Sequence, residues 1–226
     1  MSVVGTDGAV LAPRVMIAVP CGTMVHTDFS ASLALLVGYT TYVKPDIELP
    51  LFTVQGTYLP RARAALVNAA LERECTHLLW LDADMRFPKD ALLRLLAHNV
   101  PLVGANYATR QMPIEPTAQG FEGEPVIGGE GLVDVKYCGM GVMLTETAVF
   151  RKIGKPYFAI GYNRAADDYA GEDTFFCEAA RRHGFRVQVD ARLSEEVEHC
   201  GALRYTMAHA RLGIQTGIEA ASAVEA

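Results

Sequence analysis

The 226-residue sequence lacks several features that would exclude a compact globular protein. No apolar run approaches the ~20 residues that a membrane-spanning helix needs. The first residues lack the basic start and long apolar stretch of a secretory signal. No linker rich in Ser, Gly and Pro divides the chain. We therefore expect one domain over 1–226, with a short, loosely ordered lead-in at 1–13 and a helical tail from about 202 to 226.

The sequence also lacks an excess of basic residues and a regular cysteine pattern. Its 20 Lys and Arg residues against 26 Asp and Glu give a net charge of −6, which argues against broad electrostatic attraction to nucleic acid but leaves a local basic groove open. The five cysteines are odd in number, widely spaced and without a Cys-x-x-Cys pair. A disulfide framework or zinc knuckle is not expected, and reduced thiols in a cytoplasmic protein fit better.

What the chain does have is a regular alternation of short apolar runs and helix-like periods. This pattern is typical of βαβ units, and it predicts an α/β fold with a mixed, mainly parallel sheet flanked by helices on both faces. Residues 108–134 have no clear period and are expected to form a long loop or hairpin. The predicted strands are 14–20, 49–56, 78–81, 100–108 and 186–193, and the predicted helices are 28–40 (capped by Asp28 or Ser30), 59–74, 88–99 and 172–183.

Two carboxylates end the third predicted strand, where the sequence reads HLLWLDADMRFP. Strand alternation would point Asp82 and Asp84 to the same side, and two like charges repel unless a cation joins them or one is protonated. Carboxylates at a strand end suit Mg²⁺ or Mn²⁺, which often bridge a protein to a diphosphate. Ligands of such sheets bind beyond the carboxyl ends of the strands. The alternative is that one Asp caps the next helix and the other is a solvated turn residue.

Three further groups could take part in chemistry. Glu172 and Asp173 start a predicted helix, where negative charge is favoured anyway, or one of them could take a proton from an attacking hydroxyl. His199 follows the last predicted strand and could give a nitrogen ligand to the same cation. Arg61 and Arg63 lie in the first turn of a helix, where the dipole does not favour them. They either contact a phosphate or a carboxylate or are ordinary surface residues, and Arg110 has the same standing.

In this order, these segments resemble a small GT-A glycosyltransferase of the family 2 type, a form frequent in phage and bacterial genomes. The resemblance spans about residues 15–201, most of the chain. The stretches that carry it are MIAVP, RARAALVNAAL, the Asp-x-Asp of LLWLDADMRFP, CGMGVML, GEDTFFCEAARRHGF and the late His199.

The resemblance implies a transferase that moves a single sugar from a nucleotide-diphosphate sugar, with a UDP-sugar favoured. Asp82 would approach the ribose or the metal, while Asp84 and His199 would ligate a divalent cation, Mn²⁺ or Mg²⁺. Asp173 would be the general base of an inverting reaction, with Glu172 binding the acceptor or the donor sugar. The donor would also be contacted by Pro20, Cys21 and Gly22 at the first strand end, by Arg61 and Arg63, and by Gly139 and Gly141 around the sugar.

The chain departs from the family in two respects. It has no membrane-associating tail, and the Gln-x-x-Arg-Trp stretch of the acceptor side is absent, which disfavours a processive polymerase. The acceptor stays open among a glycan, a protein and a small molecule, with a modified nucleic acid disfavoured by the net charge. Two other readings also stay open: a non-catalytic nucleotide-sugar or glycan binding module of the same fold, and a nucleotidyltransferase. The latter would want a Gly-rich, basic loop where this chain has PCGTMVHTD.

Overall fold

The computed structural model describes residues 3–4, 10–164, 167–202 and 204–213. Its centre is a seven-stranded sheet in which five strands run in one direction and two, β9 and β8, run against them. The predicted mixed, mainly parallel sheet is therefore confirmed. In spatial order the strands are β4 (Leu51–Gln55), β3 (Val15–Cys21), β5 (His77–Leu81), β9 (Val142–Glu146), β7 (Leu102–Gly104), β12 (Val187–Asp190) and β8 (Leu132–Val135).

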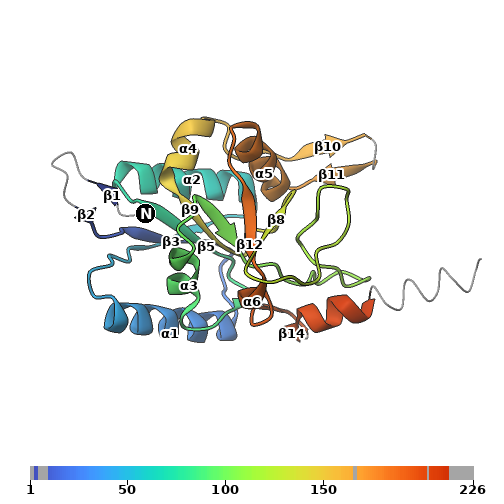
Figure 1. Cartoon of the computed structure of the whole chain (residues 1–226), viewed down its shortest axis with the longest axis horizontal. Coiled ribbons are helices and arrows are strands. Elements are labelled where there is room, and N and C mark those ends of the chain that lie inside the picture. The colour runs from blue at the N-terminus through green and yellow to red at the C-terminus, as the bar shows by residue number, and fades with distance from the viewer. Residues whose placement is uncertain (1–2, 5–9, 165–166, 203, 214–226) are drawn as a thin grey trace, which may run out of the picture.

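Helices cover both faces of the sheet, as predicted (Figure 1). The helices α1 (Thr27–Val43) and α3 (Ala91–Ala97) pack on one face through an apolar cluster that also contains Leu193 of α6 (Ala191–Ser194). On the other face lie α2 (Leu59–Glu72), α4 (Thr147–Ile153) and α5 (Glu172–Arg182). Strand β5 is buried along its whole length because both faces are covered, which explains its unbroken apolar sequence.

Helix α1 begins one residue earlier than predicted, and its cap is different. The Nδ1 atom of His26 accepts a hydrogen bond from the backbone N–H of Asp28 at 3.2 Å, so His26 is the N-cap. The expectation that Asp28 or Ser30 caps this helix is wrong. Asp28 lies inside the first turn, where its carboxylate is 3.0 Å from the guanidinium of Arg204.

Several short strands were not predicted because two or three residues are too few to show a period. A three-stranded sheet joins β6 (Met85–Arg86), β13 (Glu198–Cys200) and β14 (Arg204–Tyr205). The predicted polar loop before α5 contains a hairpin of β10 (Gly161–Asn163) and β11 (Asp168–Ala170). Both small sheets lie beside the site described below, and the hairpin projects next to α5 (Figure 1).

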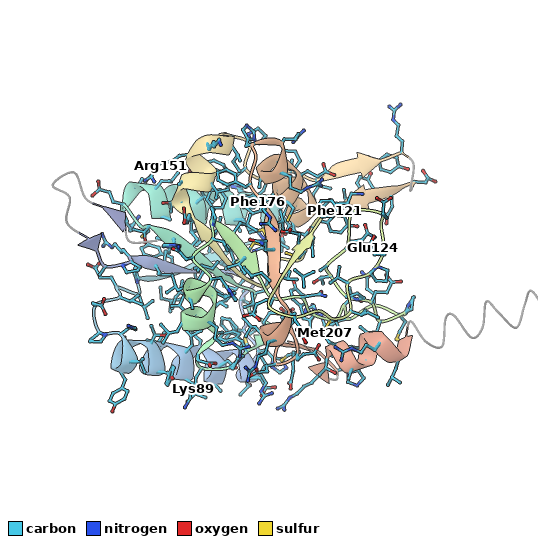
Figure 2. The ribbon with its side chains drawn as sticks, viewed as in Figure 1. Lys89, Phe121, Glu124, Arg151, Phe176 and Met207 are labelled. Carbon is cyan, nitrogen blue, oxygen red and sulfur yellow. The ribbon has the colours of Figure 1, made fainter. Side chains whose placement is uncertain are left out.

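The two ends of the chain differ in part from expectation. Within the predicted loose lead-in, β1 (Val3–Val4) pairs with β2 (Val10–Leu11). Residues 207–213 are helical, and the rest of the predicted helical tail, 214–226, lies outside the described residues. Met207, labelled in Figure 2, is buried in a small cluster with Ala108 and Ala210. No helix in the described part of the chain is long and apolar enough to cross a membrane.

The long segment after β7 is irregular, as predicted, but it is held in place by one buried side chain. Asn106 donates to the carbonyl of Val126 at 2.6 Å and accepts from the N–H of Ala118 at 2.9 Å. These bonds fold the segment back against the sheet. Phe121, at its outer turn, is labelled in Figure 2.

Candidate active site

The two aspartates that follow β5 lie in a turn at the carboxyl end of the central strand. The N–H of Asp82 donates to the carbonyl of Gly141 at 3.0 Å, which ends the pairing with β9, and the N–H of Met85 then donates to Asp82 at 3.1 Å. Strand alternation does not apply to the two carboxylates, because β5 ends at Leu81, before both of them. Both residues nevertheless line one cavity, described below, and each carboxylate meets its own arginine.

We call Arg63, Asp82 and Glu172 the inner ion-pair network. The Arg63 side chain is only 2% exposed; its Nη2 lies 2.9 Å from Asp82 Oδ1 and its Nε lies 3.2 Å from Glu172 Oε1. It also lies 5.7 Å from the ring of Trp80. Burial raises the pKa of Asp82, which Arg63 opposes and the neighbouring charges of Asp84 and Glu172 reinforce.

The inner ion-pair network gives the two arginines in the first turn of α2 different environments. The surface interpretation does not describe Arg63, because its guanidinium is enclosed; of the two predicted kinds of contact, the one with carboxylates is present. Arg61, two residues earlier, is exposed. Residues two apart on a helix point in different directions, so one arginine can be buried while its neighbour faces solvent.

We call Asp84, Arg110 and His199 the outer charge group. Asp84 Oδ2 lies 2.8 Å from Arg110 Nη2 and 3.5 Å from His199 Nε2, and the Asp84 side chain is 31% exposed. Burial would raise the pKa of Asp84, but the hydrogen bond and charge of His199 together with Arg110 lower it overall. Asp84 is thus held ionised at the open side of the site.

His199 reaches Asp84 because a short ladder joins residues far apart in the chain. In that ladder His199 of β13 lies opposite Met85 of β6, and the N–H of Cys200 donates to the carbonyl of Asp84 at 2.7 Å. The ring is fixed at its other side, where Nδ1 lies 3.0 Å from the carbonyl of Ala108. A carbonyl can only accept, so Nδ1 carries a proton. In the charged ring Nε2 also carries a proton and donates to Asp84, whereas in the neutral ring Nε2 has the lone pair that could bind a cation.

The aspartates open onto a cavity of about 650 Å³, which we call the strand-end pocket. Its wall brings together the end of β3, the turn after β5, and β13. The predicted residues that line it are Pro20, Cys21, Gly22, Asp82, Asp84, Arg110 and His199.

Glu172 and Asp173 occupy the first turn of α5, as predicted. Burial raises the pKa of Asp173, and the charge of Glu172 adds to the rise. A Cβ added to Gly171 would lie 2.7 Å from Asp173 Oδ1, so the glycine leaves room for the carboxylate. A carboxylate whose pKa is raised is a stronger base when ionised.

The two glycines of the Gly-Met-Gly turn make room for a side chain rather than only for a ligand. A Cβ on Gly139 would overlap the hydroxyl of Tyr107, and one on Gly141 would lie 2.8 Å from that ring. Tyr107 is buried, accepts a hydrogen bond from the Gly141 N–H at 3.0 Å, and packs edge-on against His199 with ring centroids 5.4 Å apart. Tyr107 had no predicted role: it fell within the predicted strand 100–108, but β7 ends at Gly104, three positions before it.

A second cavity of about 550 Å³, which we call the hairpin pocket, lies beside the start of α5. Its wall contains Gly171 and Thr174, the neighbours of the two acidic residues, and the hairpin β10–β11. The prediction missed its aromatic residues. The signal for them was the concentration of tyrosine in otherwise polar sequence, at Tyr137, Tyr162 and Tyr169.

The outer charge group has the donor set for a divalent cation. Asp84 offers a carboxylate oxygen, and the lone pair of His199 Nε2 faces it, with Nδ1 anchored as in many metal-binding histidines. Arg110 would have to yield its position on Asp84 Oδ2. Asp82 fits less directly, because both of its oxygens accept hydrogen bonds from Arg63, at 2.9 and 3.2 Å.

A second group of possible ligands, His26, Asp28 and Cys200, has its donor atoms within 4.8 Å of one another. Two of its members are already engaged, since His26 Nδ1 caps α1 and Asp28 pairs with Arg204. Burial and the charges of Asp28 and Glu198 raise the pKa of the Cys200 thiol. The group therefore suits a cation less well than Asp84 and His199 do.

Comparison with known proteins finds likeness in structure alone. No protein-family model and no curated protein matches the sequence. The crystal structure of A197 from STIV aligns with a TM-score of 0.61 at 17% identity, over 87% of this chain and 91% of that one. The crystal structure of residues 1–349 of S. aureus TarS aligns with a TM-score of 0.47 at 15% identity, over 79% of this chain and 58% of that one.

A glycosyltransferase involved in glycosylation of the major capsid of PBCV-1 aligns with a TM-score of 0.35 at 13% identity, over 64% of this chain and 70% of that one. At these identities the likeness concerns the fold. The sheet order, the helices on both faces and the fit to A197 agree with the architecture that the sequence predicted. The chain has a GT-A-like α/β fold.

Proposed function

We propose that the protein is a metal-dependent glycosyltransferase that moves one sugar from a nucleotide-diphosphate sugar, with a UDP-sugar favoured, to an acceptor hydroxyl. The observation that carries the proposal is the strand-end pocket, where the ends of β3 and β5 meet Asp84 and His199. A cavity at the carboxyl ends of parallel strands is where nucleotides bind in α/β sheets. Its volume of about 650 Å³ is within the range of small-molecule sites.

In this proposal Asp84 and His199 would be the protein ligands of the Mn²⁺ or Mg²⁺ that accompanies the donor diphosphate. The cation would offset the negative charge that builds up on the leaving diphosphate. Asp82 is oriented by Arg63 and faces the ribose or the cation. Pro20, Cys21 and Gly22 lie along the wall that the nucleoside would contact.

Asp173 is the proposed general base. The acceptor oxygen forms a bond to the anomeric carbon, the bond from that carbon to the diphosphate oxygen breaks, and the acceptor proton passes to Asp173. One base and attack opposite the leaving group give inversion. Glu172 is held by Arg63 and therefore acts on a sugar hydroxyl rather than as a second base.

Thermal unfolding with UDP or GDP, each with and without Mn²⁺, tests the donor site. Stabilisation that requires nucleotide and cation together is the expected result. Stabilisation by nucleotide without any cation effect would contradict the metal assignment. No response to either nucleotide would contradict the donor assignment and favour a binding module for another ligand.

Hydrolysis of a panel of nucleotide sugars then tests turnover and names the donor, because a transferase without acceptor passes sugar slowly to water. Release of nucleoside diphosphate is expected for one member of the panel. Release of nucleoside monophosphate and sugar 1-phosphate, from cleavage between the two phosphates, would instead indicate the nucleotidyltransferase reading.

A further inference from the structure

The hairpin pocket has no part in the donor site, yet its wall contains residues on both sides of the proposed base. We propose that it binds a pyranose ring of the acceptor, so that the acceptor is a glycan or glycoside rather than a protein side chain or a nucleic acid. This inference rests on the proposed function, since it assigns the second substrate of the same site.

The hairpin pocket lies next to the proposed base. The strand β11 ends at Ala170, and Gly171, Glu172 and Asp173 follow directly, so the hairpin and the proposed base belong to one continuous segment. Gly171 and Thr174 both line the pocket. Tyr137 lines the pocket together with these two residues, and the charge of Asp173 adds to the rise that burial causes in the pKa of the Tyr137 hydroxyl. A ligand in this pocket therefore lies beside the base.

Two tyrosines give the hairpin pocket an exposed aromatic surface. Tyr162 and Tyr169 are 51% and 72% exposed, face each other across the hairpin with ring centroids 5.2 Å apart, and both line the pocket. Two neighbouring aromatic rings in the wall of a cavity form a contiguous exposed apolar surface, the kind of patch that marks a ligand-binding groove, unlike a single exposed ring elsewhere on the surface. The C–H face of a pyranose is apolar and packs on an aromatic ring, while its hydroxyls stay at the polar edge.

The wall of the hairpin pocket also carries polar groups of mixed charge. Lys136, Asp168 and Glu178 give the wall charges of both signs, and the Tyr137 hydroxyl donates to Gln119. Sugar hydroxyls donate and accept, so they can use both kinds of partner. A nucleic acid needs a predominantly basic surface, which this pocket does not offer.

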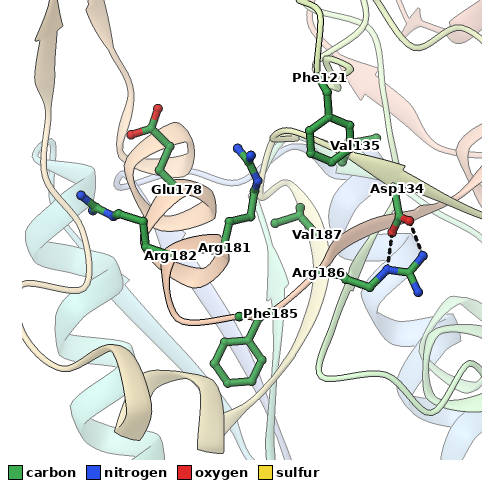
Figure 3. A pocket seen from close by; sticks show the side chains of 10 residues that line it. Phe121, Asp134, Val135, Glu178, Arg181, Arg182, Phe185, Arg186 and Val187 are labelled. Carbon is green, nitrogen blue, oxygen red and sulfur yellow. Dashed lines mark hydrogen bonds and ion pairs between the residues drawn. The ribbon is translucent and has the colours of Figure 1, made fainter.

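A neighbouring cavity differs from the hairpin pocket in the charge of its wall. Glu178 also lines a space of about 540 Å³ farther along α5, with Arg181, Arg182 and Arg186 (Figure 3). Arg186 is paired with Asp134, and Arg181 lies 5.1 Å from the ring of Phe121. An anionic ligand would be drawn to that cavity, whereas the mixed charges of the hairpin pocket suit an uncharged sugar.

The test is ligand-detected NMR with a panel of methyl pyranosides, the gluco, galacto, manno and N-acetylglucosamine forms, in the absence of donor. At least one is expected to bind. The double variant Tyr162→Ala, Tyr169→Ala should weaken that binding about fivefold to tenfold, because each ring supplies stacking area. Tyr169→Phe keeps the ring and should keep binding.

Tyr42→Ala is the matched control, since Tyr42 is 87% exposed on α1 and away from the pocket. It should bind the sugar as the unchanged protein does. All of these tyrosines are exposed, and circular dichroism checks that each variant folds. Binding of no pyranoside, or binding that the double variant leaves unchanged, overturns the proposal.

The thermal response to UDP with Mn²⁺ separates this inference from the proposed function. It should be the same in the unchanged protein and in every tyrosine variant. If pyranosides bind through the tyrosines but the nucleotide has no effect, the sugar site stands and the transferase proposal fails. If the nucleotide binds but no pyranoside does, the transferase stands and the acceptor class is wrong. Tighter binding of a single-stranded oligonucleotide or an unglycosylated peptide at the tyrosines would also overturn the acceptor class.

Discussion

Asp82 of the inner ion-pair network and Asp84 of the outer charge group are separated in the sequence by Ala83 alone, but their surroundings differ. Asp82 meets a guanidinium that is enclosed by protein, whereas Asp84 meets Arg110, whose side chain is 43% exposed, and the edge of a histidine ring. Burial raises the pKa of Asp82 despite its arginine, while His199 and Arg110 lower the pKa of Asp84 despite its partial burial.

The difference separates a part that is fixed from a part that can exchange its partner. Arg63 cannot leave without stranding two carboxylates in the interior, so the inner network holds Asp82 and Glu172 in place. Arg110 can move into solvent, which would free Asp84 for a cation. We infer that the inner network positions groups and that the outer group binds and releases a ligand.

The largest effect is expected at the base beside the inner network. Asp173→Asn keeps the shape and the hydrogen bond from Thr174 but cannot accept the proton, so transfer to acceptor should fall by about 10²–10⁴-fold. Donor binding, followed by the thermal response to UDP with Mn²⁺, should not change. Transfer at the original rate would exclude Asp173 as the base. Arg182→Gln, an exposed change at the end of the same helix and outside both proposed substrate pockets, is the control and should leave transfer intact.

The second-largest effect, on stability, is expected when the inner ion-pair network is broken. Arg63→Met keeps the length of the side chain but leaves Asp82 and Glu172 unpaired, and we expect the free energy of unfolding to fall by about 3 kcal/mol. Urea unfolding measures it. The matched control is Arg61→Met, two residues away on the exposed side of α2, which should change stability by less than about 0.5 kcal/mol. Equal losses in both variants would mean that the buried pairing is not what stabilises this region.

The outer group should respond in the opposite way, with binding lost and stability kept. Asp84→Asn removes the charge from a partly exposed carboxylate, and the affinity for Mn²⁺ in the presence of UDP should fall at least about tenfold. Isothermal titration with Mn²⁺ measures the affinity, and urea unfolding should show little change, because pairs this exposed contribute little. Glu196→Gln, which breaks an exposed pair with Arg94, is the control and should bind Mn²⁺ normally. An unchanged Mn²⁺ affinity in Asp84→Asn would remove Asp84 from the site.

The same comparison explains how much of the site could be predicted from sequence. Asp82, Asp84 and the acidic pair of α5 stand beside strong local patterns, a buried strand and a helix start, so their places in the fold followed from those patterns. The partners could not be predicted, because Arg63 meets Glu172 across 109 residues and His199 meets Asp84 across a ladder of two-residue and three-residue strands. The hairpin with its tyrosines was missed for the same reason, since short strands carry no period.

A smaller effect sharpens the claim that Arg110 can exchange with a cation. Arg110→Gln removes the competitor from Asp84 Oδ2, so Mn²⁺ should bind a few-fold more tightly in the absence of nucleotide. The same titration measures it. Weaker binding would mean that Arg110 helps to assemble the cation site, for example through its bond to the Cys200 carbonyl at 3.0 Å.

The smallest effect is a pH dependence of stability that arises from Asp173, the neighbour of Glu172 in the inner ion-pair network. Burial and Glu172 raise the folded pKa of Asp173 above its ordinary value of 3.8, so its ionised form destabilises the fold at pH values above the folded pKa. Asp173→Asn should therefore melt about 1–3 °C higher at pH 7, and the gain should disappear once the pH falls well below 3.8, where the carboxyl is protonated in both the folded and the unfolded state. Melting curves at pH 7 and at about pH 2.5 measure it. A gain that persists at the lower pH would have another origin, such as helix capping, because the charge that burial disfavours is already neutralised there.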